Sequence, residues 1–128
     1  MTRKAINAAG AAAVGPYSHA IEANDLLFLS GQVPVDPATG MLAPNTIGEQ
    51  TVQCFKNLFA VLESAGLTPD DVVNVHVYLT DMGDFQVMND IFAKHFSKPY
   101  PARTTVGVAS LPRGARIEMG FTASMRRQ

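Results

Sequence analysis

The chain has 128 residues, of which 47% are hydrophobic and 16% charged, and this is enough apolar material for one core. We therefore expect a single domain over residues 1–128. The formal net charge is −1 and no Lys/Arg run is longer than the final pair Arg126-Arg127, so the sequence has no basic patch suited to nucleic acid or to an anionic membrane surface.

The N-terminal segment MTRKAINAAGAAAVGP imitates a secretion signal, because a basic pair precedes small apolar residues. Only Ile6 and Val14 in it are strongly apolar and Gly15-Pro16 interrupts it, so we expect no signal peptide. No apolar run approaches the roughly 20 residues of a bilayer span. The single cysteine excludes an intrachain disulfide and suits a reducing compartment, which predicts a cytoplasmic protein without a membrane partner.

Two β-prone runs, SHAIEA and LLFLSGQV, flank the polar pair Asn24-Asp25. A two-residue break of this kind is typical of a β-hairpin, so we expect a strand on each side of it. The following segment, VDPATG, has the chemistry of a turn, because Pro37 presets φ and Gly40 is free to adopt positive φ.

Helical spacing of apolar residues begins at Ile47 and ends before Gly66, a residue type that often caps a helix C-terminus. The apolar positions of this predicted helix are Ile47, Cys54, Phe55, Leu58, Leu62 and Ala65. Because Cys54 lies on the apolar stripe, we expect a buried, inert thiol rather than a nucleophile.

Residues 73–79 alternate valine or leucine with polar residues, which is the pattern of a strand covered on one face. A second helix is predicted over residues 85–96, and the Pro99-Tyr100-Pro101 segment ends it. Its apolar residues recur at intervals of three or four: Phe85, Met88, Phe92 and Phe96.

Two further strands follow, and each carries one charged residue within an apolar run: Arg103 in PARTTVGV and Glu118 in ARIEMGF. Side chains alternate between the faces of a strand. We expect the core to receive Thr104, Val106 and Val108 from the first of these strands, and Ile117, Met119 and Phe121 from the last. Arg103, Thr105, Gly107 and Glu118 would then lie on the other face, where a cross-strand ion pair is the simplest interpretation of Arg103 and Glu118.

The order strand-strand-helix-strand-helix-strand-strand predicts an α+β layer, with one sheet and both helices on one of its faces. The opposite face would still expose apolar surface, so we expect another subunit to cover it. The residues concerned are Phe28, Val72, Tyr78, Gly107 and Gly120.

Signatures of common cofactor and metal sites are absent from the sequence, which has no GxxxxGK[ST], GxGxxG, HExxH or CxxC. The three histidines, His19, His76 and His95, lack the spacing of metal ligands. We interpret each as a surface or partly buried imidazole. We therefore expect neither a nucleotide cofactor nor a metal.

The chain from about Gly15 onward resembles the RidA family of enamine/imine deaminases, formerly called YjgF. The resemblance lies in six segments: GPYSHAI, LFLSGQVPVDPATG, NLFAVLESAGLTPDDVV, VYLTDMGDFQVMNDIFAKHF, PARTTVGVASLP and IEM. It implies a chorismate-mutase-like α+β fold, a homotrimer with three clefts between subunits, and no cofactor or metal. It also implies hydrolysis of 2-aminoacrylate, 2-iminopropanoate and 2-iminobutanoate to 2-oxo acids and ammonia, which would protect pyridoxal-phosphate enzymes from these intermediates.

By this resemblance, Arg103 corresponds to the anchor of the substrate carboxylate, and its planar guanidinium offers two parallel donors for that task. Glu118 corresponds to the acid that handles water, and the sequence leaves open whether it acts as base, acid or water-positioner. Further matches to cleft positions are Tyr17, Ser30, Gly31 and Asn89. Gly31 would let backbone groups approach the ligand. From the residues alone, the others fit equally well a turn tyrosine, a strand hydroxyl and a solvated helix amide.

Many relatives have cysteine where this chain has Thr105, two residues after Arg103. The backbone N–H of Thr105 can still bind a carboxylate, so we expect its side chain to be a spectator that alters substrate preference at most. Two other functions stay open. One is a non-catalytic trimer that binds 2-oxo acids as a metabolite sensor. The other is RNA cleavage or translation inhibition, which the negative charge disfavours.

Overall fold

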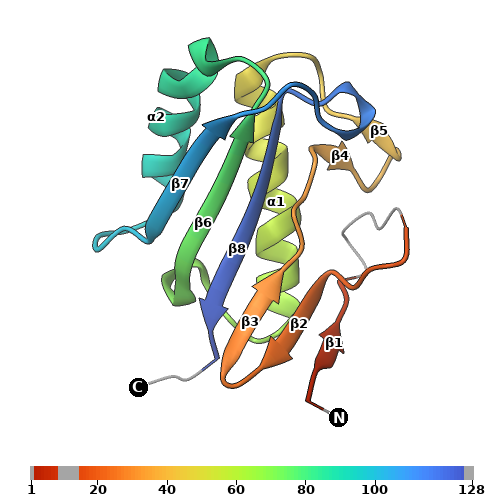
Figure 1. Ribbon diagram of the computed structural model, residues 1–128, viewed down its shortest axis with the longest axis vertical. Coiled ribbons are helices and arrows are strands. Elements are labelled where there is room, and N and C mark those ends of the chain that lie inside the picture. The colour runs from red at the N-terminus through yellow and green to blue at the C-terminus, as the bar shows by residue number, and fades with distance from the viewer. Residues whose placement is uncertain (1, 9–14, 126–128) are drawn as a thin grey trace.

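The computed structural model describes residues 2–8 and 15–125. In this part of the chain, six strands form one mixed sheet in the order β1-β2-β3-β8-β6-β7, in which only the β6–β7 pair is parallel. Helices α1 (Ile47–Ser64) and α2 (Phe85–His95) both lie behind this sheet, against one face (Figure 1). The predicted α+β layer is thereby confirmed. The strands of the sheet are β1 (Lys4–Ile6), β2 (Ala20–Ala23), β3 (Leu26–Leu29), β6 (Val72–Leu79), β7 (Ala102–Gly107) and β8 (Ile117–Ser124).

The predicted hairpin is present as β2 and β3. Asn24 and Asp25 both have positive φ, 52° and 63°, as a two-residue turn that matches the strand twist requires. The predicted turn around Pro37 is also present. It joins two short strands, β4 (Val35–Asp36) and β5 (Met41–Leu42), which form a separate sheet, with Gly40 at φ 72°.

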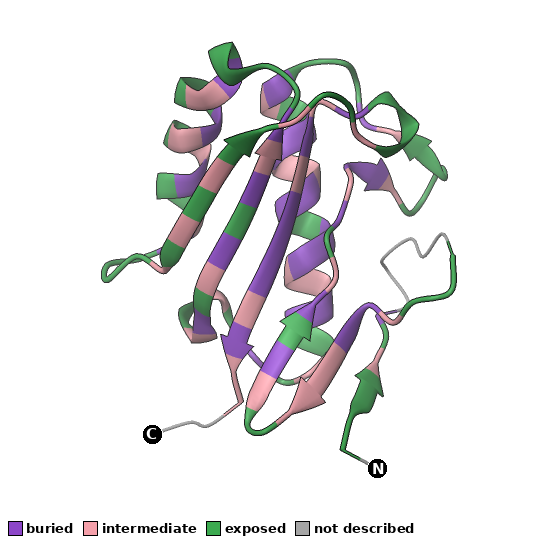
Figure 2. Cartoon of the chain, in the orientation of Figure 1, coloured by how far each residue is buried: buried purple, intermediate pink, exposed green. Residues whose placement is uncertain are grey.

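Helix α1 follows the predicted boundaries. Thr46 caps its first turn by accepting a hydrogen bond from the N–H of Glu49 at 3.1 Å, and Gly66, at φ 74°, follows its last turn. Its inner stripe packs on the sheet together with residues from α2, β6 and β8, and Figure 2 shows the buried stripe against the sheet. This burial forms the main core.

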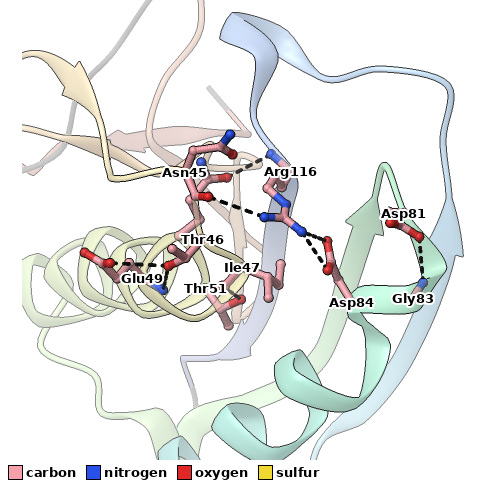
Figure 3. A network of polar contacts seen from close by, with 10 residues as sticks. Asn45, Thr46, Ile47, Glu49, Thr51, Asp81, Gly83, Asp84 and Arg116 are labelled. Carbon is pink, nitrogen blue, oxygen red and sulfur yellow. Dashed lines mark hydrogen bonds and ion pairs between the residues drawn. The ribbon is translucent and has the colours of Figure 1, made fainter.

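A polar network joins the first turns of both helices to β8 (Figure 3). Arg116, just before β8, donates two hydrogen bonds to the buried Asp84 carboxylate, at 2.8 and 3.1 Å, and one to the Asn45 carbonyl. Its backbone N–H donates to Gln50 Oε1 at 2.9 Å. Because Asp84 precedes α2 and Asn45 precedes α1, the network fixes where β8, which carries Glu118, enters the sheet.

Strand β1 was not predicted. It pairs with β2, and two bonds to His19 tie down the residues after it: Ala8 N–H donates to His19 Nδ1 at 2.9 Å, and Asn7 Oδ1 accepts from His19 N–H at 3.0 Å. His19 is consequently buried, which corrects its interpretation as a surface or partly buried imidazole. The predictions for residues 9–14 lie outside the described part of the chain.

The sheet face opposite the helices carries Phe28 and Val106, which are 46% and 40% exposed, and the partly buried Tyr78. In the described residues no element covers this face (Figure 1). Three predictions for it were wrong: Val72 is buried in the core, Gly107 lies on the helix side, and Gly120 is buried rather than exposed. Within the part that the structure describes, no helix is long and apolar enough to cross a bilayer.

Candidate active site

Four of the predicted site residues line one pocket of about 360 Å³. The segment after β3 supplies Ser30 and Gly31, β8 supplies Glu118, and Tyr17 comes from the segment before β2. The turn between β7 and β8 forms another wall. We call this site the glutamate pocket, and it is lined by Tyr17, Ser30, Gly31, Gln32, Val33, Val35, Pro112, Arg113 and Glu118.

Gly31 lies directly against the carboxylate of Glu118. A Cβ added at Gly31 would stand 2.5 Å from Glu118 Oε2 and 3.1 Å from its Cδ, distances at which one group must move. A side chain at position 31 would therefore displace the carboxylate. The sequence suggested that Gly31 makes room for a ligand, and the structure adds that it makes room for Glu118.

The Glu118 side chain is half-buried on the sheet face opposite the helices, and this loss of water raises the pKa of its carboxyl group. A raised pKa brings the carboxyl closer to neutral pH, where such a group can both accept and return a proton. Beside it, the Ser30 hydroxyl donates to the Ser18 carbonyl at 2.7 Å, so its oxygen is oriented to accept from a ligand or water.

Arg103 and Asn89 line a second pocket, of about 340 Å³, between β7 and α2. The guanidinium carbon of Arg103 lies 4.7 Å from the ring centroid of Phe92 and 5.5 Å from that of Phe85. Burial lowers the pKa of Arg103, but an arginine stays charged at neutral pH. We call this site the arginine pocket, and it is lined by Asn89, Phe92, Ala93, Tyr100, Pro101 and Arg103.

The arginine pocket suits an anion. Aromatic rings stacked against a guanidinium leave its N–H edge available for a carboxylate. Among the residues that the structure describes, no carboxylate forms an ion pair with Arg103, whereas Arg116 is paired with Asp84. The charge of Arg103 is therefore available for a ligand.

Comparison with known proteins identifies the family of this chain. The family model described as Endoribonuclease L-PSP matches residues 6–125. A mouse protein named 2-iminobutanoate/2-iminopropanoate deaminase is 42% identical over 118 residues, which cover 91% of this chain and 87% of the mouse protein. The chain belongs to the RidA (YjgF) family.

Two further relatives match over most of their length. RutC family protein y4sK of Sinorhizobium fredii is 48% identical over 113 residues, covering 88% of this chain and 90% of that protein. The crystal structure of RidA from the Antarctic bacterium Psychrobacter sp. PAMC 21119 matches with a TM-score of 0.91 at 40% identity, covering 94% of this chain and 98% of that one.

Within the described protomer, the two charged candidate residues, Arg103 and Glu118, do not share a site. Arg103 pairs with Val75 across the ladder and Glu118 pairs with Tyr78, three residues further along β6. Because alternate residues of a strand face opposite sides, Arg103 lies on the helix face and Glu118 on the other. The prediction that both lie on the non-core face was wrong for Arg103. The predicted cross-strand ion pair was wrong too, because β6 separates β7 from β8.

The reason for the error is the edge position of β7. Thr104 and Val106, which we expected in the core, are exposed, while Arg103 and Thr105 face α2. At this edge the Arg103 side chain packs against the rings of Phe85 and Phe92 in α2. Long charged side chains can cover apolar surface in this way.

Thr105 lies two residues after Arg103, on the same side of β7, and lines neither pocket. Its hydroxyl oxygen is buried and has no hydrogen-bond partner among the described residues. The expected role of its backbone N–H in ligand binding stays a prediction.

Sequence reasoning missed two features of these pockets. Phe85 and Phe92 were interpreted only as core residues of a helix, and nothing in their spacing indicates that they also flank Arg103. Arg113 was not considered at all, although the PRG sequence signals a turn between β7 and β8.

The remaining candidates are structural. Among the described residues, no group of three His, Cys, Asp or Glu side chains is placed to hold a metal ion. Cys54 is fully buried, its thiol donates to the Gln32 carbonyl at 3.3 Å, and burial, with a smaller contribution from the charge of Glu118, raises its pKa. The prediction of a buried thiol is confirmed. Its raised pKa disfavours the reactive thiolate.

Proposed function

We propose that this protein hydrolyses 2-enamine and 2-imino acids, such as 2-iminobutanoate and 2-iminopropanoate, to 2-oxo acids and ammonia. Family membership and the name of the mouse relative support this type of activity. A carboxylate anchor at Arg103 and a half-buried acid at Glu118 are the two groups such a reaction needs.

The observation that carries the proposal is the separation of these two groups. A 2-imino acid holds its carboxylate and its reacting carbon on adjacent atoms, so anchor and acid must both reach one small ligand. Arg103 and Glu118 of one protomer lie on opposite sheet faces and line separate pockets. We therefore propose a homotrimer in which the arginine pocket of one subunit meets the glutamate pocket of the next.

The exposed apolar face supports this assembly. Phe28, Tyr78 and Val106 lie on the face that also bears Glu118, and burying them against another subunit would be favourable. Light scattering at micromolar concentration tests it, and a monodisperse monomer would contradict the shared cleft.

The chemistry follows from the proposed cleft. The guanidinium fork of Arg103 binds the carboxylate, and water adds to the carbon of the protonated imine while Glu118 accepts one proton from that water, which gives a carbinolamine. Glu118 then returns this proton to the amino nitrogen, and the C–N bond breaks as ammonia leaves. The carbinolamine hydroxyl forms the carbonyl and gives its proton to the departing ammonia, so the overall change turns one protonated imine and one water into one 2-oxo acid and one ammonium ion.

The decisive experiment couples a threonine dehydratase to this protein and times the disappearance of 2-iminobutanoate. Arg103→Ala and Glu118→Gln proteins should each lose most of the activity. When the two are unfolded, mixed in equal amounts and refolded together, about a quarter of the clefts should combine an intact arginine with an intact glutamate from different subunits, and activity should return to that level. A site built within one protomer would recover nothing.

The same purified parent and variant proteins also distinguish the proposed function from the two alternatives. A metabolite sensor would bind 2-oxobutanoate without accelerating imine hydrolysis. RNA cleavage, which the description of the family model names, is disfavoured by the net charge of −1, and an activity on RNA that survives in the Arg103→Ala protein would point to contamination.

A further inference from the structure

Arg113 has an unusual backbone conformation. It lies in the short turn Pro112–Gly114, with φ 63° and ψ 15°, in the left-handed region that residues other than glycine and asparagine seldom adopt. This conformation costs about 1 kcal/mol or more for an arginine, whereas glycine would adopt it freely. An arginine at a position that glycine would occupy without strain indicates that the Arg113 side chain has a role.

The Arg113 side chain is held at the glutamate pocket. Its Nη2 donates to the Gly40 carbonyl at 3.0 Å, which fixes the guanidinium against the β4–β5 turn, and Arg113 lines the pocket together with Glu118. Among the described residues no carboxylate lies within 4.0 Å of it. Arg116, three residues further, is paired with Asp84 instead and is structural.

The shape and chemistry of the pocket indicate what this guanidinium binds. Val33, Val35 and Pro112 provide apolar walls, and a volume of about 360 Å³ holds a short aliphatic chain. Glu118 and Arg113 form no ion pair although they line the same pocket, so both charges remain available to a ligand. In the proposed cleft, Arg103 already binds the α-carboxylate, and Arg113 is therefore left for a second acidic group.

We propose that Arg113 is a specificity-determining residue that binds an acidic side chain, so that 2-imino dicarboxylic acids are substrates of this site. This inference rests on the proposed function and extends it to a substrate class. The reaction is unchanged: 2-iminosuccinate and one water give oxaloacetate and ammonia, with no oxidation or reduction. The guanidinium fork of Arg113 would bind the distal carboxylate by charge-assisted hydrogen bonds.

The test compares two imines that amino-acid oxidases generate in place, 2-iminosuccinate from aspartate and 2-iminobutanoate from 2-aminobutanoate. The measured quantity is the ratio of their kcat/KM values. Arg113→Gly removes the guanidinium and suits the backbone, and it should lower the ratio by about tenfold to a hundredfold. Arg113→Lys should lower it less. Lys94→Ala, which removes an exposed charge on α2, should leave it unchanged.

An unchanged ratio in Arg113→Gly would overturn the inference. If the parent protein hydrolyses neither imine, the proposed function fails, and binding then decides the role of Arg113 separately. Calorimetric titration with 2-oxoglutarate and 2-oxobutanoate should show that Arg113→Gly weakens the binding of 2-oxoglutarate selectively. Equal affinities of the two 2-oxo acids in the parent and the variant would refute a second carboxylate site.

Discussion

The contact between Gly31 and Glu118 can be tested by adding a single methyl group. In Gly31→Ala the new Cβ would lie 2.5 Å from Glu118 Oε2 unless one of the two moves. The carboxylate is the end of a flexible side chain and moves more easily than the backbone. We therefore expect the variant to fold with Glu118 rotated away from its present position.

The expected loss of catalysis in Gly31→Ala is larger than the expected loss of stability. Gly31 does not have positive φ, so alanine suits its backbone, and the crowding should cost no more than about 1–3 kcal/mol of unfolding free energy. General acid–base assistance contributes about a hundredfold to ten-thousandfold, equivalent to about 3 to 5 kcal/mol in the barrier. The turnover of 2-iminobutanoate should therefore fall by that factor while the protein stays folded.

The assay is imine hydrolysis with the spontaneous rate subtracted, together with urea denaturation. Gly48→Ala, in the first turn of α1, is the matched control, because its Cβ would meet only Ile91 Cδ1 of α2 at 3.9 Å, and it should retain both activity and stability. Adding Gly31→Ala to Glu118→Gln should cause no further loss. An equal loss in both backgrounds would refute the reasoning and show that Gly31 acts through its own backbone.

Further predictions concern the other charged groups and Thr105. Arg103→Lys keeps the charge but loses the fork and the ring contacts, so 2-oxobutanoate affinity, measured by calorimetry, should fall by roughly tenfold or more, and an unchanged affinity would exclude bidentate anchoring. Since the pKa of Glu118 is raised, ionising it costs stability as pH rises from its usual value through the raised one. Glu118→Gln should therefore melt at a higher temperature than the parent above that window, and parallel melting curves would contradict this. Thr105→Ala should change kcat/KM by less than about tenfold, and a thousandfold loss would make the hydroxyl a participant. Arg116→Met leaves the buried Asp84 without its partner and should lower the unfolding free energy by roughly 2–4 kcal/mol, measured in urea.

Local patterns in the sequence were sufficient to predict the elements that bury one well-defined face. The apolar stripe from Ile47, the cap at Gly66 and the polar pair Asn24-Asp25 each act over a few residues, and the structure places helix, cap and turn accordingly. Such signals depend on local backbone chemistry and periodicity, which the chain carries wherever it folds.

The sequence did not predict features set by distant partners. Strand β1 is three residues long without alternation, and its neighbours are tied to His19 by side-chain bonds that no periodic pattern signals. The core face of β7 was assigned from the alternation that puts Thr104 on the same side as Val106 and Val108, but an edge strand contributes little to the core. There Arg103 contacts the rings of α2, which only the packing of α2 on the sheet determines.

The candidate site likewise combines features that local sequence predicts with features that distant partners determine. The resemblance named the charged residues, yet their relation depends on the register of β6 with its two neighbours, where three positions separate Val75 from Tyr78. An odd separation puts Arg103 and Glu118 on opposite faces. In the proposed assembly this has an energetic consequence. Desolvation lowers the pKa of Arg103 and raises that of Glu118, so each charge is destabilised within its own protomer. A bound carboxylate next to Arg103 offsets the desolvation of its guanidinium. Ligand binding would then relieve a cost that folding of the single chain leaves in place.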